Sequence, residues 1–319
     1  MSVATPGNDH RLGANEAPPA IISVYLGEYL ENIITEFMDG NEVSDMKLVH
    51  DYNIKGFKSL PADNSDRNRT SPVAFTGNKF EFRMLGSSCS AALPNIVINT
   101  IMAKALDESI TALKKVKKKD LERCVIDLIR NNFTEHKKVI FSGDGYSAGW
   151  IKEAVERGLP NITSTVEAIS HYDDRKNADL LEDYGIFSES EIKARKTILF
   201  EQYSNTIAVE IKTLIKMANR EVLPSIAREI LIYKEAKGNM LKKHYDRLSS
   251  CYENIAAGIE KLENDYCKVA KEKDEYRLAK KMRELYAKEM PEIRKHIDEY
   301  ESISSKDIFT IPTYSEILF

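Results

Sequence analysis

The chain has 319 residues, a mass of 36.3 kDa and a net charge of −4. The length suits about two domains, and the balance of 46 Lys and Arg against 50 Asp and Glu argues against a nucleic-acid-binding protein. Four scattered cysteines and six scattered histidines form no metal-ligand spacing, so we expect reduced thiols in a cytoplasmic protein. The most apolar stretch, residues 91–106, is too short and too interrupted by polar residues to span a membrane.

The first part of the chain, residues 1–118, is predicted to contain both helices and strands. Apolar side chains recur with helical spacing over residues 17–38, and Gly40 suits the left-handed conformation that ends a helix. A further helix is expected to begin at Pro94 and to continue towards Lys118, because proline is tolerated in the first turn of a helix.

Residues 79–84 alternate charged and apolar side chains, which predicts a strand with its charged side chains on one face. That face carries Lys79, Glu81 and Arg83. Glu81 would bind Mg²⁺ through oxygen, and the two cations would neutralise phosphate or carboxylate oxygens. The same pattern is typical of the solvent face of an amphipathic strand with a local ion pair, and the residues alone leave both interpretations open.

Three other segments contain polar residues suited to a binding site. Residues 8–19 form a polar loop that enters a helix, where Arg11 would hold a carboxylate and Glu16 would accept a proton. Residues 66–69 add two arginines. Residues 143–147, Gly-Asp-Gly-Tyr-Ser, lack the full spacing of a phosphate-binding loop and predict a turn whose serine caps the next helix. Each segment also fits an ordinary solvated loop or turn.

The second part of the chain is predicted to be almost entirely helical and is richer in charged residues than the first. Helices are expected at residues 119–136, 148–157, 163–182, 190–222, 224–237, 239–272 and 275–302. Apolar residues repeat in alternating steps of four and three from Leu241 to Val269, and a second apolar seam runs from Leu278 to Tyr300. The predicted fold class is α+β, mostly α, with domains at 1–118 and 119–319 and a long antiparallel helical hairpin in the second domain.

Three of these segments, in this order, resemble glutamine synthetase and specifically its type III class. They are NDHRLGANEAPP at residues 8–19, DRNRTSP at residues 66–72 and FTGNKFEFR at residues 75–83. The Gly-Asp-Gly-Tyr-Ser turn and the final segment, IPTYSEILF, also resemble that class. The resemblance covers the whole chain, with its most specific motifs in the first part.

The resemblance implies that residues 1–118 are the C-terminal part of the glutamine synthetase catalytic barrel and that residues 119–319 are its helical C-terminal domain. It implies the synthesis of glutamine from glutamate, ammonium and ATP through γ-glutamyl phosphate. Mg²⁺ or Mn²⁺ would be the metal, ATP a substrate, and the full-length protein a cytoplasmic homo-oligomer that acts on neither nucleic acid nor membrane.

The resemblance also assigns roles to three residues in the loops. Arg11 matches the arginine that holds the substrate glutamate. Glu16 matches the flap glutamate, which covers the site and takes a proton from ammonium. Arg69 matches a catalytic arginine that stabilises the transferring phosphoryl group on the ATP side.

The strand residues match three further positions of the family. Glu81 matches a metal-binding glutamate, and Arg83 matches the following arginine, which contacts substrate and phosphate. Lys79 stands where many family members have an ATP-side arginine, so the charge is kept while the planar fork is lost. The commoner classes carry a second arginine shortly after the Arg69 match, where this chain has Val73-Ala74-Phe75, and that contact is in doubt.

In the family, a β-grasp domain and most of the barrel precede the Arg11 motif, which here lies ten residues after Met1. We therefore expect the chain to be the C-terminal portion of a type III enzyme and to be inactive alone. The alternative is a helical interaction or assembly module that retains the catalytic residues without turnover. A third hypothesis, which leaves the resemblance aside, is a coiled-coil-containing scaffold.

Overall fold

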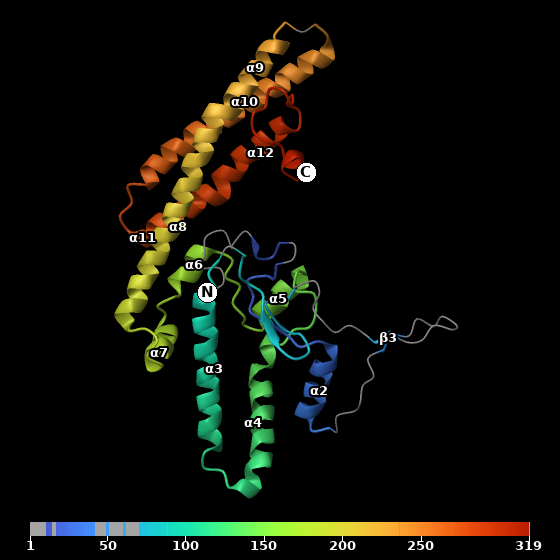
Figure 1. Ribbon diagram of the computed structural model, residues 1–319, viewed down its shortest axis with the longest axis vertical. Helices are drawn as coiled ribbons and strands as arrows, with labels where there is room; N and C mark the ends of the chain where they lie inside the picture. Colours follow the sequence, from blue (N-terminus) through green and yellow to red (C-terminus); the bar gives the residue numbers. More distant parts are fainter. Residues whose placement is uncertain are drawn as a thin grey trace, which may run out of the picture. The chain divides into compact units, whose positions relative to one another are not determined.

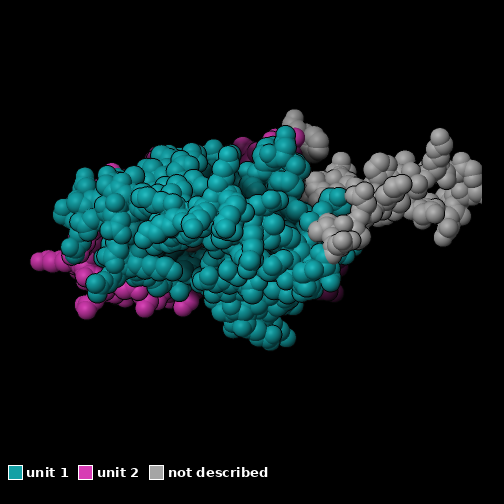
Figure 2. Space-filling model, turned by 90° about the horizontal axis from the view of Figure 1, so that it is seen from below, with its two compact units in different colours: residues 1–192 teal, residues 193–319 magenta. Residues whose placement is uncertain are grey.

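The computed structural model describes residues 11–14, 17–41, 49–50, 60–61, 70–87, 89–235 and 237–318. Contacts divide the chain into two compact units, unit 1 (residues 1–192) and unit 2 (residues 193–319) (Figure 2). Most of the described residues form helices, and their strands belong to one three-stranded and one two-stranded sheet. The mostly helical class predicted from the sequence is therefore confirmed. Within the described ranges, no helix has both the length and the apolarity needed to cross a membrane.

The described part of unit 1 contains five short strands. They are β1 (Val24–Tyr25), β2 (Val49–His50), β3 (Leu60–Pro61), β4 (Val73–Phe75) and β5 (Phe80–Phe82). In the larger sheet, β4 lies between β1, to which it is parallel, and β5, to which it is antiparallel. β2 and β3 pair antiparallel with each other. The strand predicted at residues 79–84 is confirmed over Phe80–Phe82.

A tight connection joins β4 to β5 and fixes their register. Ala74 lies opposite Glu81, and the N–H of Thr76 donates to the carbonyl of Lys79 at 2.9 Å. Gly77 has a φ of 94°, a conformation that glycine adopts without strain. In β5, as in any extended strand, alternate side chains emerge on the same face.

Besides these strands, the described part of unit 1 contains helices. They are α2 (Glu28–Asp39), α3 (Ala92–Leu113), α4 (Leu121–His136), α5 (Ala148–Glu156), α6 (Thr165–Ser170), α7 (Arg175–Asp183) and the beginning of α8 (Glu189–Met217). Short 3₁₀ turns, η1 (Lys118–Asp120) and η2 (Lys137–Val139), flank α4. α2 ends at Gly40, which has a left-handed φ of 78°, and Ser147 caps α5 by accepting the N–H of Trp150 at 3.1 Å. Both helix boundaries agree with the sequence-based predictions.

Residues 17–27 were predicted to begin the helix that ends near Met38, and this prediction is wrong. The segment is extended: Ile21 forms an isolated bridge with Asn161, and β1 pairs with β4. Ile21 is also fully buried beside Trp150. Two prolines and several β-branched residues favour an extended backbone here, and pairing with distant segments outweighs the helical spacing of the apolar residues.

The core of unit 1 joins this N-terminal segment to helices that come much later in the chain. Ile21 packs against Trp150, and the ring of Phe141 stacks on Trp150 with 3.7 Å between centroids. These contacts join α5 and the segment before it to the N-terminal part of the first compact unit. The predicted domains, residues 1–118 and 119–319, divide the chain elsewhere. That boundary stays a prediction, because a compact unit and a family domain are different divisions.

Unit 2 consists of helices and their connections. The helical segments are the rest of α8, the π-helical η3 (Ala218–Val222), α9 (Leu223–Tyr233), α10 (Asn239–Val269), α11 (Glu275–Glu284), the π-helical η4 (Leu285–Glu289), α12 (Met290–Glu301) and α13 (Tyr314–Leu318). α10 packs against α9 and α12, which lie beside it in Figure 1.

α10 and the segment from α11 to α12 run in opposite directions. Near one end Glu272 pairs with Lys281 at 2.6 Å, and near the other Arg247 pairs with Glu299 at 3.7 Å. The buried side of α10 consists of Leu248, Cys251, Ile255, Ile259 and Leu262. Four of these five residues belong to the apolar seam identified in the sequence, so the seam is the side by which the helix packs.

Both π-helical segments end two residues before a proline. η3 precedes Pro224, and η4 precedes Pro291. Proline has no N–H, and its ring crowds the preceding turn, so the wider π turn relieves the clash within a continuous helix. α8 and α9 are thereby joined without a break, as are α11 and α12.

Candidate functional site

The charged face of β5 is formed by Lys79, Glu81 and Arg83. The Nζ of Lys79 donates to Glu81 Oε1 at 2.8 Å, and the Nε and Nη2 of Arg83 each donate to Glu81 Oε2 at 3.2 Å. The exposed fraction of the side chain falls from 62% for Lys79 to 12% for Arg83. The prediction that these three side chains share one face is therefore confirmed.

The electrostatics of this face keep Glu81 ionised. The hydrogen bonds from Lys79 and then from Arg83 hold the pKa of the Glu81 carboxyl below its usual value. Two cations and one anion leave the face with an excess of positive charge, which suits phosphate or carboxylate oxygens. The same contacts also form the local ion pair expected under the alternative interpretation of the strand.

Arg11 lies at the C-terminal end of the same strand. Its Nη1 donates to the carbonyl of Met84 at 3.0 Å, and its Nη2 donates to the carbonyl of Arg83 at 3.5 Å. A predicted residue of the N-terminal loop is thus bonded to the main chain at the end of this strand, more than 70 positions away in the sequence. The two other predicted residues, Glu16 and Arg69, lie outside the described residues.

The backbone that leads into β4 holds the end of β5. The N–H of Arg83 donates to the carbonyl of Pro72 at 2.8 Å, which extends the pairing beyond the strand. Thr70 and Ser71, immediately before this proline, are buried, with 7% and 0% exposure. The sequence patterns did not predict this supporting role of Thr70 and Ser71. The motif at residues 66–72 contains both residues, but only its arginines were interpreted as functional.

Glu81 offers the oxygen atoms that Mg²⁺ and Mn²⁺ prefer as ligands. Within the described ranges, no three or more His, Cys, Asp or Glu residues form a group that could hold a metal ion. Proteins often hold Mg²⁺ through one or two carboxylates together with substrate phosphates. Glu81, flanked by two cations that suit phosphate, fits one ligand position of such a shared site.

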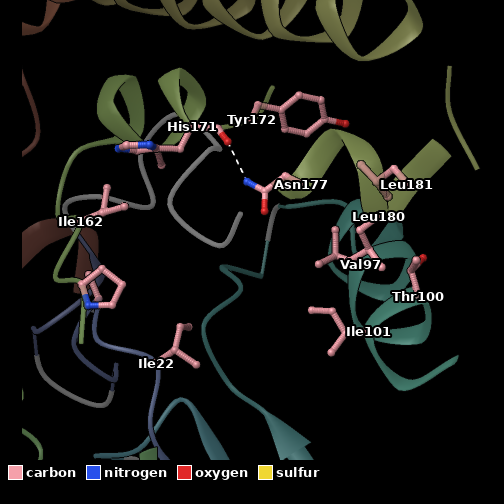
Figure 3. Close-up of a pocket in the computed structure, with 13 residues that line it drawn as sticks. Ile22, Val97, Thr100, Ile101, Ile162, His171, Tyr172, Asn177, Leu180 and Leu181 are labelled. Carbon is pink, nitrogen blue, oxygen red and sulfur yellow. Dashed lines mark hydrogen bonds between the residues drawn. The ribbon is translucent and has the colours of Figure 1, made fainter. Parts of the chain in front are cut away.

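A separate cavity of about 290 Å³ lies between α3, α6, α7 and the residues before β1 (Figure 3). Its apolar lining includes Ile22, Val97, Ile101, Ile162, Leu180 and Leu181. Its polar lining groups bond locally, since the Nδ2 of Asn177 donates to the carbonyl of His171 at 2.8 Å and the Nδ1 of His171 lies 2.8 Å from Asp174. Of the predicted site residues that the structure describes, Arg11, Lys79, Glu81 and Arg83, none lines this cavity. Several distant segments form it, so no local sequence pattern could have predicted it.

The helical region matches a known domain. Residues 124–237 match the sequence model of the glutamine synthetase C-terminal domain. The match begins in α4 and ends after α9, and therefore covers helices of both compact units.

Curated relatives align with the whole chain. The Type-3 glutamine synthetase of Dictyostelium discoideum is 38% identical over 341 residues, which cover 100% of this chain and 46% of the relative. The glutamine synthetases of Bacteroides fragilis and Butyrivibrio fibrisolvens are 32% and 31% identical, and the aligned regions cover 46% and 47% of their lengths. The chain is a homologue of the C-terminal portion of glutamine synthetase.

This homology confirms the family recognised from the motifs at residues 8–19, 66–72 and 75–83. The type III class also agrees with the name of the Dictyostelium relative. The chain spans about half the length of the curated relatives it matches. The individual roles assigned to the glutamine synthetase site residues stay predictions.

Proposed function

We propose that this chain supplies one side of the active site and the helical domain of a type III glutamine synthetase. The reaction is the ATP-dependent ligation of ammonia to glutamate, with ADP and phosphate as the other products. The observation that carries the proposal is the pairing of Lys79, Glu81 and Arg83 on one strand face, with Arg11 bonded to the main chain at the end of that strand. The names of the homologues support it.

Each described residue has a role that its position supports. Phosphoryl transfer depends mainly on positioning and on cations around the phosphate oxygens. Lys79 would contact ATP from its exposed position, and Arg83 would bind substrate and phosphate with its planar fork. Arg11, whose guanidinium lies beside the main chain of Arg83 and Met84, would hold the carboxylate of glutamate.

Glu81 would serve as a metal ligand. Its ionised carboxylate lies beside both cations, so it is ready to bind Mg²⁺ or Mn²⁺ and to release Lys79 and Arg83 to phosphate oxygens. When bound, the metal supplies positive charge that stabilises the phosphates. Arg69 would stabilise the transferring phosphoryl group, and Glu16 would accept the proton of ammonium.

The finer architecture belongs to the same proposal. β1, β4 and β5 would be strands of the catalytic barrel, whose other strands lie in the half of the sequence that the relatives carry in addition. We call this chain together with that additional half the complete enzyme. It would be a cytoplasmic homo-oligomer that uses glutamate, ammonium and ATP, and α10 with α11 to α12 would form its helical hairpin.

The test compares two glutamate substitutions in the complete enzyme. Glu81→Gln keeps the size of the side chain and removes the metal ligand, so we expect glutamine synthesis to fall by about 10³-fold or more. Glu108→Gln changes an exposed glutamate that also pairs with a lysine, Lys104, and should leave the rate within about twofold. Unchanged activity and metal dependence in Glu81→Gln would remove Glu81 from the site.

A second candidate function is an assembly module without turnover, and the surface of α3 favours it. Five large apolar side chains on this helix are between 36% and 57% exposed: Ile98, Ile101, Met102, Leu106 and Ile110. Exposed apolar surface of this extent is typical of an interaction site. Oligomerisation of the complete enzyme without any glutamine synthesis would favour this function over the ligase.

A further inference from the structure

The turn at residues 143–147 packs against the backbone that leads into the site. Gly145 is buried, and a Cβ atom added to it would lie 2.1 Å from the carbonyl oxygen of Thr70 and 2.9 Å from the carbonyl carbon. Real Cβ atoms essentially never approach other atoms within 3.0 Å. The φ of Gly145 is not in the left-handed region, so close approach, and not backbone conformation, requires a glycine here.

The turn that presents Gly145 is held by its own hydrogen bonds. The Oδ1 of Asp144 accepts the N–H of Tyr146 at 2.9 Å, and the carbonyl of Asp144 accepts the hydroxyl of Ser147 at 2.9 Å. Ser147 in turn caps α5, which is anchored by the buried Trp150. The turn therefore cannot move without disturbing the start of this helix.

The segment before the turn is also fixed to the sheet. The N–H of Phe141 donates to the carbonyl of Val24 at 3.0 Å, and Ile140 forms an isolated bridge with Val24. This places the turn beside the edge strand β1, and Figure 1 shows α5 next to the sheet. Both ends of the turn are thus held by hydrogen bonds that do not involve Thr70.

On the other side of the contact, Thr70 leads directly to the charged face. It directly follows Arg69 in the sequence and lies two residues before Pro72, whose carbonyl accepts the N–H of Arg83 at 2.8 Å. A shift of the Thr70 backbone would therefore be passed through two peptide units to the backbone of Arg83.

We propose that the Gly-Asp-Gly-Tyr-Ser turn positions β4 and β5, the strand pair of the active site. Gly145 sets the distance between this turn and the backbone of Thr70. Gly145 is a positioning residue: it touches Thr70 and acts on Arg83 through Pro72. The inference rests on the proposed function for its catalytic consequence, whereas its structural consequence can be measured in this chain alone. It gives a role to a motif that the proposed chemistry leaves unused.

The first experiment measures amide hydrogen exchange in this chain. Gly145→Ala requires a movement of about 1 Å to bring the added Cβ to 3.0 Å, so the N–H of Arg83 should exchange at least about tenfold faster. Gly149→Ala is the matched control, because its added Cβ would meet only Ser147 Oγ at an ordinary 3.8 Å. It should leave the exchange rate within about twofold.

A folded Gly145→Ala variant with unchanged exchange at Arg83 would overturn the inference. If that variant does not fold, Asp144→Ala decides, because it loosens the turn without adding an atom near Thr70. It should raise the exchange rate at Arg83 by a smaller factor than Gly145→Ala would, and an unchanged rate would overturn the inference equally.

The second experiment measures glutamine synthesis by the complete enzyme. A displacement of about 1 Å at a reacting group can reduce the rate by about 100-fold, so we expect Gly145→Ala to lose kcat/KM on that scale. Ala154→Gly destabilises α5 at a buried position away from Thr70 and serves as the stability-matched control. Equal losses in the two variants would reduce Gly145 to a structural role. Lack of activity in the complete enzyme without any substitution would refute the proposed function. The hydrogen-exchange measurement would still decide whether Gly145 positions the strand pair.

Discussion

The sheet that carries the charged face and the helices of unit 2 are ordered by contacts of different kinds, backbone pairing in the first and packing of apolar side chains in the second. β5 is held by its neighbour β4, by the carbonyl of Pro72 and by Arg11, which lies 73 positions from its partner Met84. β4 in turn pairs with β1, about fifty positions earlier. The site therefore depends on segments that are far apart in the chain.

The helices of unit 2 are ordered mainly by the packing of apolar side chains, and the packed helices are also distant in sequence, since Tyr300 bonds Glu229 71 positions away. α10 buries one continuous side and packs mainly against α9 and α12, and exposed ion pairs such as Arg247–Glu299 flank this packing. Most of the stability of such helices comes from packing an apolar face, and exposed ion pairs add little.

Because of this difference, substitutions in the two regions should have different effects. In unit 2, a change in a buried side chain should cost stability, because the packing is what orders the helices. At the charged face, substitution of a partly exposed side chain should lower the catalytic rate and change the stability little. A change in a distant backbone contact should alter the site without touching its charged residues.

The largest expected effect is the loss of turnover when this chain is studied alone. Glu81 is a single carboxylate, and Mg²⁺ bound by so few protein ligands should be held weakly. We expect no glutamine synthesis, while circular dichroism should still report folded helices. The measurement is phosphate release with glutamate, ammonium, ATP and Mn²⁺, and turnover of about 1–10³ per second would contradict the expectation.

Next in size is the effect of a cavity in unit 2. Ile255 is fully buried in α10, so Ile255→Ala should lower the free energy of unfolding by about 2–5 kcal/mol. Met240→Ala removes a side chain that is 76% exposed on the same helix and lies outside the seam, so it should cost much less. Urea denaturation of both variants measures the difference, and equal losses would show that the seam does not order the helix.

A smaller effect is expected from a buried polar contact in the same unit. The hydroxyl of Tyr300 donates to Glu229 at 3.1 Å, and Glu229 also accepts the N–H of Ser305 at 3.1 Å. Tyr300→Phe leaves a buried carboxylate with one donor fewer and should cost about 1–3 kcal/mol. The control Tyr276→Phe alters a 43% exposed ring. Its free energy of unfolding should stay within about 0.5 kcal/mol of the parent, and a matching loss there would refute the account of Glu229.

The smallest effect concerns the pH dependence of the charged face. Lys79 and Arg83 lower the pKa of Glu81 from its usual 4.5, so the ion pairs contribute stability above that value and lose it as the pH falls through the lowered pKa. A nuclear magnetic resonance titration of the Glu81 carboxyl carbon should give a midpoint below 4.5. Lys79→Met should move the midpoint upwards. A midpoint unaffected by that substitution would contradict the observed pairing.

The features that could be predicted from sequence are those encoded by nearby residues. Alternation predicted the shared face of Lys79, Glu81 and Arg83, and the cap at Ser147 followed from the turn that precedes a helix. The apolar seam likewise contains Ile255, which is buried as the spacing indicates.

The remaining features depend on contacts between distant segments. Residues 17–27 have helical spacing but are extended, because Ile21 and β1 pair with segments that no local pattern reveals. The contact between Gly145 and Thr70 and the approach of Arg11 to Met84 have the same origin. Family resemblance identified several of these segments, but it did not indicate how they support one another.

The most direct test of the central claim is a structure of the complete enzyme with glutamate, Mg²⁺ and a non-hydrolysable ATP analogue. The account predicts an oxygen of Glu81 at about 2.1 Å from the metal, with Lys79 and Arg83 turned towards phosphate oxygens. Nucleotide and metal bound elsewhere, with Glu81 still paired to both cations as it is here, would contradict the assignment of this face as the active site.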